Sequence, residues 1–365
     1  MVDPRTRKLA KLVVEYCVEV KREESVFIQG HPLAFPLINE IYRECLIHDA
    51  YPMVMAKLDL DYTFYKHAKD HQLKYISPIR KFIIENIDVL IGIACQSNTR
   101  ALANVDPAKI RMEKEHGKEL LEIYLKRSAE GKLRWNGVAY PSSSQAQEAA
   151  MSLEEYEDFV YSSCLVDKKD PVAEWKRIKS QQKKICDFLR RKRSIHIVGD
   201  ETDLTLNVEG RKWINSDGKR NMPSGEVFTA PLENSASGTI KFSYPGIYLG
   251  REVEDVSLTF KDGKVIHASA IKGNDLLQQI MKVEGADRIG EVAIGTNYGI
   301  TKFTKLILFD EKMGGTIHIA LGAAYPEAGG RNKSAIHWDI LKDMKKDATI
   351  YADDKPFYKD GQFLI

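Results

Sequence analysis

The chain has 365 residues, of which 43% are hydrophobic and 29% charged, and 54 basic against 52 acidic residues leave a net charge of +2. This length and composition suit a globular protein of two or three domains, and the near balance of charge excludes a general attraction to nucleic acid or to an anionic membrane. No apolar run approaches the roughly 20 residues that span a bilayer and the first residues lack a secretory signal, so we expect a cytoplasmic protein.

The first half of the chain alternates short apolar strands with amphipathic helices. Strands are expected at Ser25–Gly30, Tyr51–Asp59 and Val89–Cys95. Apolar residues recur at helical spacing between and around them, in Leu9–Val20, Pro36–Leu46, Tyr62–His71 and Ile79–Asn86, and a long charged helix is expected over Pro107–Ser128. This alternation predicts an α/β domain with a mostly parallel sheet over residues 1–190.

A helix is expected over residues 170–193, where it would link this domain to the next. Trp175, Ile178, Ile185 and Leu189 fall on one face of it, and nine Lys and Arg residues lie between Lys176 and Arg193. Such a basic run is either the solvated face of a helix or a nucleic-acid contact. The solvated face is the commoner origin, and no aromatic residues interleave there, so no nucleic-acid partner is expected.

From Ser194 the sequence changes to short β-rich runs separated by glycine-containing turns. Asp262-Gly263 stands between alternating flanks and indicates a hairpin, and Thr304–Asp310 belongs to the same series of apolar runs. We therefore expect residues 191–365 to form a β-rich α+β domain, mostly of antiparallel sheet.

Acidic and histidine residues stand within apolar, glycine- or proline-containing segments of this second domain. Each has a simple structural explanation, such as an exposed strand acid, an ion pair of Glu291 with Arg288, or a hydrogen-bonded core histidine. The candidate residues are Glu226 in MPSGEVFTAP, Glu291 in RIGEVAIGTN, Glu311 and His318 in DEKMGGTIHIALG, and His337 and Asp339 in SAIHWDIL.

Taken together, these residues favour a metal centre. His337 and Asp339 are two apart, so on an extended segment both side chains point to one side. Carboxylates with a minority of imidazoles suit Zn, Co or Mn, and several carboxylates able to bridge suggest two divalent ions. Such cations would keep Glu291 ionised among its apolar neighbours.

The runs GRKWINSDGKRNMPSGEVFTAP, IGEVAIGTN, DEKMGGTIHIALGAAYP and NKSAIHWD resemble the thermophilic metalloaminopeptidase family of aminopeptidase T, aminopeptidase S and PepS. The resemblance implies a dinuclear metal enzyme that removes N-terminal amino acids from peptides with a free N-terminus, usually as a homodimer. It implies that Glu226, Glu291, His318, His337 and Asp339 bind the metals. Glu311 would be a further ligand or would support the ligands, and Tyr325 in AAYP would be the catalytic tyrosine.

Two alternatives remain open from the sequence. The same metal chemistry would serve a different metal-dependent amidohydrolase or a dipeptidase, which a panel of free and blocked peptides distinguishes. A nucleic-acid-binding protein using the basic helix would instead show binding that falls steeply with salt.

Overall fold

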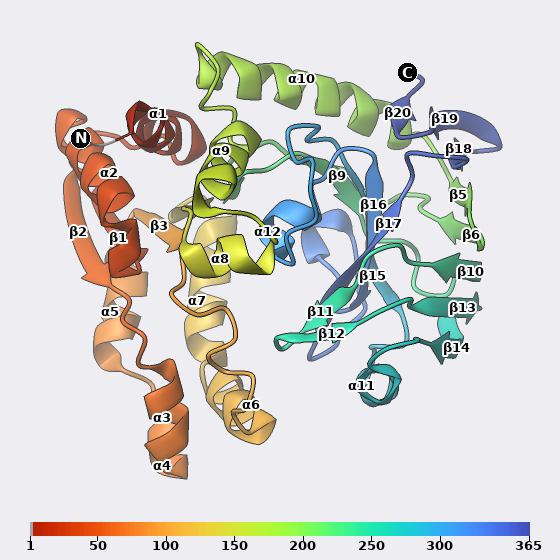
Figure 1. The fold of residues 1–365 in the computed structure, drawn as a ribbon, viewed down its shortest axis with the longest axis horizontal. Helices are drawn as coiled ribbons and strands as arrows, with labels where there is room; N and C mark the ends of the chain where they lie inside the picture. The colour runs from red at the N-terminus through yellow and green to blue at the C-terminus, as the bar shows by residue number, and fades with distance from the viewer. Residues whose placement is uncertain (1–2) are drawn as a thin grey trace. The chain divides into compact units, whose positions relative to one another are not determined.

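The computed structural model describes residues 3–365. They fall into two compact units (Figure 1). The first unit runs to Val172 and also includes Gly218–Pro223, and the second comprises Ala173–Asp217 and Ser224–Ile365.

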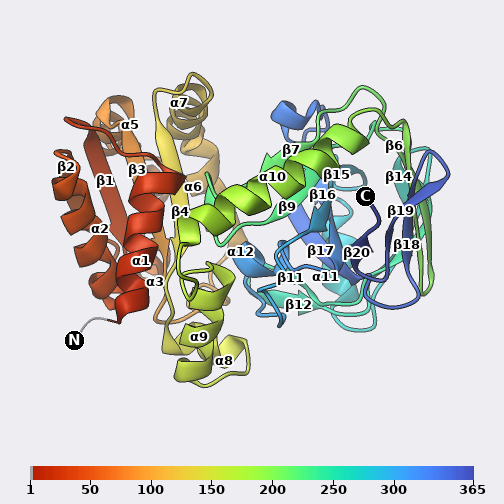
Figure 2. The ribbon, with the colours of Figure 1, turned by 90° about the horizontal axis from the view of Figure 1, so that it is seen from above.

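The first unit is built on a five-stranded sheet in which every neighbouring pair is parallel. Its strand order is β2 (Tyr51–Ala56), β1 (Ser25–Gly30), β3 (Val89–Ala94), β4 (Arg134–Ala139) and β8 (Asn221–Met222). Helices α1 and α2 lie on one face of the sheet and α5 and α7 on the other (Figure 2). The prediction of an α/β fold with a mostly parallel sheet is confirmed.

The expected long helix over Pro107–Ser128 is wrong in one respect, because the chain forms two helices that meet at Gly117. Glycine weakens a helix interior through its backbone freedom. The helices of this unit are α1 (Pro4–Leu12), the π-helical turn η1 (Val13–Cys17), the 3₁₀ turn η2 (Pro32–Ala34), α2 (Phe35–Ile47), α3 (Asp61–His67), α4 (Asp70–Leu73), α5 (Pro78–Asn86), α6 (Pro107–His116), α7 (Lys118–Ala129), α8 (Ser143–Glu148) and α9 (Leu153–Ser163).

The second unit contains two large antiparallel sheets and a two-stranded ribbon, which confirms the prediction of a β-rich domain. The eight-stranded sheet has the order β14 (Lys264–Ser269), β13 (Ser257–Lys261), β10 (Ser237–Lys241), β6 (Thr202–Asn207), β5 (Ser194–Gly199), β18 (Thr349–Ala352), β19 (Lys355–Lys359) and β20 (Gln362–Phe363). The five-stranded sheet has the order β17 (His337–Asp343), β16 (Thr316–Gly322), β15 (Ile289–Gly295), β9 (Glu226–Thr229) and β7 (Ile214–Ser216). The remaining elements are β11 (Gly246–Tyr248), β12 (Arg251–Val253), α10 (Pro171–Leu189), α11 (Asn274–Ile280), α12 (Ile307–Asp310) and the 3₁₀ turn η3 (Pro326–Ala328).

The predicted hairpin at Asp262-Gly263 is confirmed, since it joins β13 to β14 with φ of 50° and 78° at the two turn residues. Positive φ at both positions is what a two-residue hairpin turn requires. The strand expected at Thr304–Asp310 is wrong. The Asp310 carboxylate accepts hydrogen bonds from the Thr304 amide and hydroxyl at 2.7 and 2.8 Å, which closes a turn in place of a strand.

The two faces of the β17–β16–β15–β9–β7 sheet of the second unit differ. Side chains of alternate residues, among them Val227, Val292, Ile294, Ile317 and Ile319, join the large buried core that also takes in residues of the eight-stranded sheet and of α10. Because neighbouring residues of a strand point to opposite faces, the residues between them are directed away from this core.

The basic residues of α10 and the segment after it are largely paired with acids. Six of the nine form ion pairs: Arg177–Glu174, Lys179–Asp217, Lys183–Asp187, Arg190–Asp187, Lys192–Asp353 and Arg193–Glu209. This pairing is typical of a solvated helix face and leaves little unbalanced positive charge for a nucleic acid. Among the described residues, no helix is both long and apolar enough to cross a membrane.

Candidate metal centre

Most of the candidate ligands lie on the β17–β16–β15–β9–β7 sheet of the second unit, on the face that points away from the core. Glu226 lies on β9, Glu291 on β15, His318 on β16, and His337 and Asp339 on β17. Ala320 stands opposite both Glu291 and Asp339 in the sheet register, and its small side chain leaves the space between the two carboxylates open. Four strands thus direct acids and imidazoles to one place.

A β-bulge explains how Glu291 reaches this face. The β15–β16 register shifts between Ile289 and Glu291, so Ile289 points into the core and Glu291 points away from it, although the two are two residues apart. Gly290 occupies the bulge. A Cβ there would lie 2.4 Å from the carbonyl oxygen of Ala323, so only glycine fits without a shift of the backbone.

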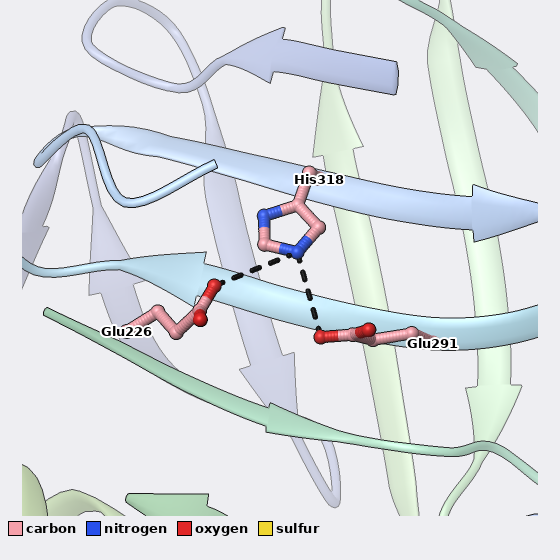
Figure 3. Close-up of side chains that lie close together, drawn as sticks. All are labelled: Glu226, Glu291 and His318. Atoms are coloured by element: carbon pink, nitrogen blue, oxygen red, sulfur yellow. Dashed lines mark ion pairs between the residues drawn. The ribbon is translucent and has the colours of Figure 1, made fainter. Parts of the chain in front are cut away.

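The imidazole nitrogens lie among the carboxylates at separations longer than hydrogen bonds. His318 Nε2 is 3.6 Å from Glu226 and 3.5 Å from Glu291 (Figure 3). His337 Nε2 is 3.3 Å from Glu291 and 3.5 Å from Asp339. Ligand atoms held at about 2.0–2.2 Å from one tetrahedral ion are separated by about 3.3–3.6 Å, so these separations fit shared cations.

The burial of these side chains and the lack of hydrogen-bond partners for two carboxylate oxygens also favour a cation site. Glu226, Glu291 and His318 are only 5%, 4% and 1% exposed. Glu226 Oε2 and Asp339 Oδ1 are buried without a hydrogen-bond partner. A buried carboxylate oxygen without a partner is costly, and a cation would remove that cost. Three overlapping groups each bring ligand atoms within 4.8 Å of one another: Glu226, Glu291 and His318; Glu291, His337 and Asp339; Glu311, His318 and Asp339.

The acidity of the side chains reflects this crowding. Burial disfavours the protonated ring of His318, but Glu291, Glu226 and Asp339 outweigh it and raise its pKa to about 9. His337 behaves in the same way, with Asp339 and Glu291 raising its pKa to about 11. Burial raises the pKa of Glu311 to about 7. In the metal-free protein, protons therefore balance the carboxylates that divalent cations would otherwise balance.

Neighbouring groups fix the orientation of two ligands. His337 Nδ1 lies 2.8 Å from the carbonyl oxygen of Ala323; an N–H donated there leaves Nε2 facing the carboxylates. The Ser216 hydroxyl donates to Glu226 Oε1 at 3.1 Å, which leaves Oε2 free to face His318. Sequence reasoning missed Ser216 because a serine in INS carries no signal of its own.

Tyr325 lies at the rim of the centre and is 43% exposed. Its ring centroid is 5.0 Å from that of His337 and 5.5 Å from that of Phe228. Burial, Glu291 and Asp339 together raise the pKa of its hydroxyl, so Tyr325 stays a hydrogen-bond donor at neutral pH.

Glu311 follows α12, and its carboxylate contacts Lys312, a neighbour that the sequence did not single out.

The structure thus brings all six candidate ligands together and places Tyr325 beside them. Their roles as ligands stay predictions. Arg288, the ion-pair partner considered for Glu291, instead donates to the carbonyl of Glu233 at 2.7 Å and to Asn234 at 2.8 Å.

Comparisons with known proteins show the family and the fold of the chain. A sequence profile of the family described as thermophilic metalloprotease (M29) matches residues 2–363. Aminopeptidase 2 of Geobacillus stearothermophilus is 26% identical over 404 aligned positions that cover 98% of this chain and 97% of that protein. Aminopeptidase T of Thermus thermophilus is 26% identical over 74% of this chain and 75% of its own length. The solved structure of wild-type AmpT from Thermus thermophilus superposes with a TM-score of 0.85 at 21% identity and covers 99% of both chains, which shows a shared fold.

Proposed function

Since the chain belongs to the thermophilic metalloprotease (M29) family, we propose that it is a metal-dependent aminopeptidase that hydrolyses the N-terminal peptide bond of peptides. The relatives that it matches over most of its length are named aminopeptidases, which supports the choice of the N-terminal bond.

The observation that carries this proposal is that buried carboxylates and imidazoles lie close together on the β17–β16–β15–β9–β7 sheet. Glu226, Glu291 and His318 would hold one divalent ion, and Glu291, His337 and Asp339 the other, with Glu291 shared. Oxygen ligands with one imidazole per ion suit Zn, Co or Mn. When bound, such ions acidify water toward a pKa of about 7 and polarise a carbonyl.

Glu311 is the side chain best suited to move the proton. It can come within ligand distance of His318 and Asp339, beside the proposed ion sites, where a carboxylate can accept a proton and return it. Its carboxylate would accept a proton from water and pass it to the nitrogen of the leaving amine.

Tyr325 is suited to the oxyanion of the tetrahedral intermediate. Its phenol stays protonated, and it stands beside His337 at the exposed rim, where a peptide carbonyl can reach it. A hydrogen bond donated as negative charge develops on that oxygen lowers the barrier by a few kcal/mol in comparable sites.

Chelation followed by metal add-back tests the proposal. The chelated protein should not cleave a peptide with a free amino end, and Zn, Co or Mn should restore cleavage from that end. The same peptide with an acetylated N-terminus should remain intact. Equal cleavage of both peptides would favour another metal-dependent amidohydrolase, and cleavage by the chelated protein would contradict the proposal.

We also infer that the chain forms a homodimer through the β2 edge of the first unit. This edge strand carries exposed Tyr51 and Met53, at 62% and 49%, and the adjoining α2 exposes Phe35, Leu46 and Ile47 at 65%, 52% and 62%. These five exposed apolar side chains contribute part of the roughly 800 Å² per partner that a stable interface needs.

Light scattering after size-exclusion chromatography tests the interface. The native chain should elute as a dimer and Phe35→Glu as a monomer. Ile271→Glu is the control, because Ile271 is 83% exposed in the second unit and outside the patch. A native monomer, or an unchanged dimer in Phe35→Glu, would contradict the inference.

A further inference from the structure

Tyr325 lies on the loop that joins β16 to β17, residues 323–336, and the first part of this loop is folded back on itself. The Tyr325 carbonyl accepts hydrogen bonds from the amides of Ala328 and Gly330, each at 3.1 Å. Ala328 also packs with Phe228 of β9 in a small buried apolar cluster. These contacts give the backbone that carries Tyr325 a defined position on the sheet.

An ion pair ties down the same loop after η3. Arg211 is only 7% exposed, and its Nη2 donates to both oxygens of Glu233 at 2.8 Å. Glu233 Oε1 also accepts the backbone N–H of Arg331 at 2.8 Å, so the carboxylate joins Arg211 to the loop. The Lys212 amide adds a second tie, because it donates to the carbonyl of Ala328 at 3.2 Å.

The ion pair supplies position more than stability. Taking the Arg211 guanidinium out of water costs free energy, which the Glu233 carboxylate offsets, and buried ion pairs often add little net stability. Their charge-assisted hydrogen bonds are directional, so they fix the carboxylate and the backbone that it holds. Tyr325 is 43% exposed, so the place of its hydroxyl depends on the backbone of the loop. A misplacement of about 1 Å in a reacting group can slow catalysis about a hundredfold.

We propose that Glu233, held by Arg211, is a positioning residue for peptide cleavage. It sets the loop so that the Tyr325 hydroxyl meets the oxyanion, and it acts through Tyr325 and not through the metal ions. This inference rests on the proposed function, because it takes Tyr325 as the donor to the oxyanion.

The test combines Glu233→Ala with Tyr325→Phe in a double-mutant cycle. Asp353→Ala is the matched control, since Asp353 also holds backbone, accepting the amides of Arg193 and Ser194 at 2.8 and 3.1 Å, but lies between β18 and β19 of the eight-stranded sheet. The value of kcat and the bound zinc per chain are measured on zinc-loaded protein. Amide hydrogen exchange over residues 325–332 is followed on the metal-free protein.

Glu233→Ala should lower kcat about tenfold and bind the native amount of zinc, because the hydroxyl is displaced and the ligands are not. In the Tyr325→Phe background the same change should cost less than about twofold, since no hydroxyl is left to misplace. The amides of Ala328 and Gly330 should exchange faster in Glu233→Ala than in the native chain. Asp353→Ala should match the native chain in kcat and in exchange over these residues.

A loss of kcat that is equal in both backgrounds would mean that Glu233 only stabilises the fold, and would overturn its positioning role. Native turnover in Glu233→Ala, or native exchange at Ala328 and Gly330, would overturn it too. A native chain that binds zinc but cleaves no peptide with a free amino end would instead overturn the proposed function, whatever the exchange shows.

Glu233→Gln supplies a second variant in case Glu233→Ala does not fold. Glutamine keeps one acceptor oxygen for the Arg331 amide but loses the charge that Arg211 meets. Its kcat and its exchange should shift in the same directions by smaller amounts. Native values for both would overturn the role of the ion pair.

Discussion

Glu291→Gln is the substitution that should damage the centre most. Among the candidate ligands, only Glu291 directs one oxygen to each histidine. Its Oε1 lies 3.5 Å from His318 Nε2 and its Oε2 lies 3.3 Å from His337 Nε2. Glutamine keeps the size of the side chain but removes its charge and one acceptor oxygen. Both divalent ions should therefore bind less tightly.

The magnitude follows from the geometry. At an effective dielectric constant of 20, a unit negative charge about 4 Å from a divalent ion attracts it by about 8 kcal/mol. If a quarter to a half of this is lost for each ion, binding weakens by about 2–4 kcal/mol, or about thirtyfold to several hundredfold in Kd. A single exposed carboxylate would give far less, because solvent screens it.

Calorimetric zinc titration of the chelated variant measures this loss. Glu284→Gln is the matched control, since Glu284 is an exposed acid of the same unit and should leave both affinities unchanged. We expect Glu291→Gln to weaken both binding steps. If it weakened only one step, Glu291 would not be shared, and if it weakened neither, the assignment of the centre would be wrong.

Three further predictions follow from the site. Tyr325→Phe should retain its metal and lose about a hundredfold in kcat, and unchanged turnover would remove Tyr325 from the reaction. Gly290→Ala should lower Tm and metal affinity together, because the added Cβ meets the Ala323 carbonyl at 2.4 Å and displaces the bulge; an unaltered melting curve would count against the bulge. In the metal-free protein, the raised pKa values of His318 (about 9) and His337 (about 11) contribute stability below about pH 6.5 that is lost as pH rises through those values. Thermal unfolding of chelated protein should therefore show a lower Tm at about pH 9 than at about pH 6, and a higher one would refute this.

The strands of the first unit were predictable because their signals are local. Ser25–Gly30 has three consecutive apolar residues, Val26, Phe27 and Ile28, and ends at a glycine, and it forms β1 with the same bounds. The hairpin at Asp262-Gly263 was predictable because few other residues tolerate positive φ at both turn positions. The single helix over Pro107–Ser128 failed at Gly117, and the strand at Thr304–Asp310 failed because a short apolar run does not distinguish strand from helix.

The candidate ligands that the sequence singled out lie close together, but the geometry that brings them together was not predictable. Spacing alone placed His337 and Asp339 on one side of a strand, and β17 bears this out. Simple alternation would have put Ile289 and Glu291 on the same face, and only the bulge at Gly290 separates them. Lys312 gave no signal, since a lysine after an acid is common on exposed turns, and its burial depends on contacts with the distant Glu226.

On our proposal, acids and imidazoles of the β17–β16–β15–β9–β7 sheet bind two divalent ions on which peptide cleavage depends. Its most direct test is a stepwise zinc titration of the chelated chain that follows bound metal and release of the N-terminal residue in the same samples. We expect no release without zinc and a rise that levels off when two ions are bound per chain. Full release at zero bound metal would contradict it.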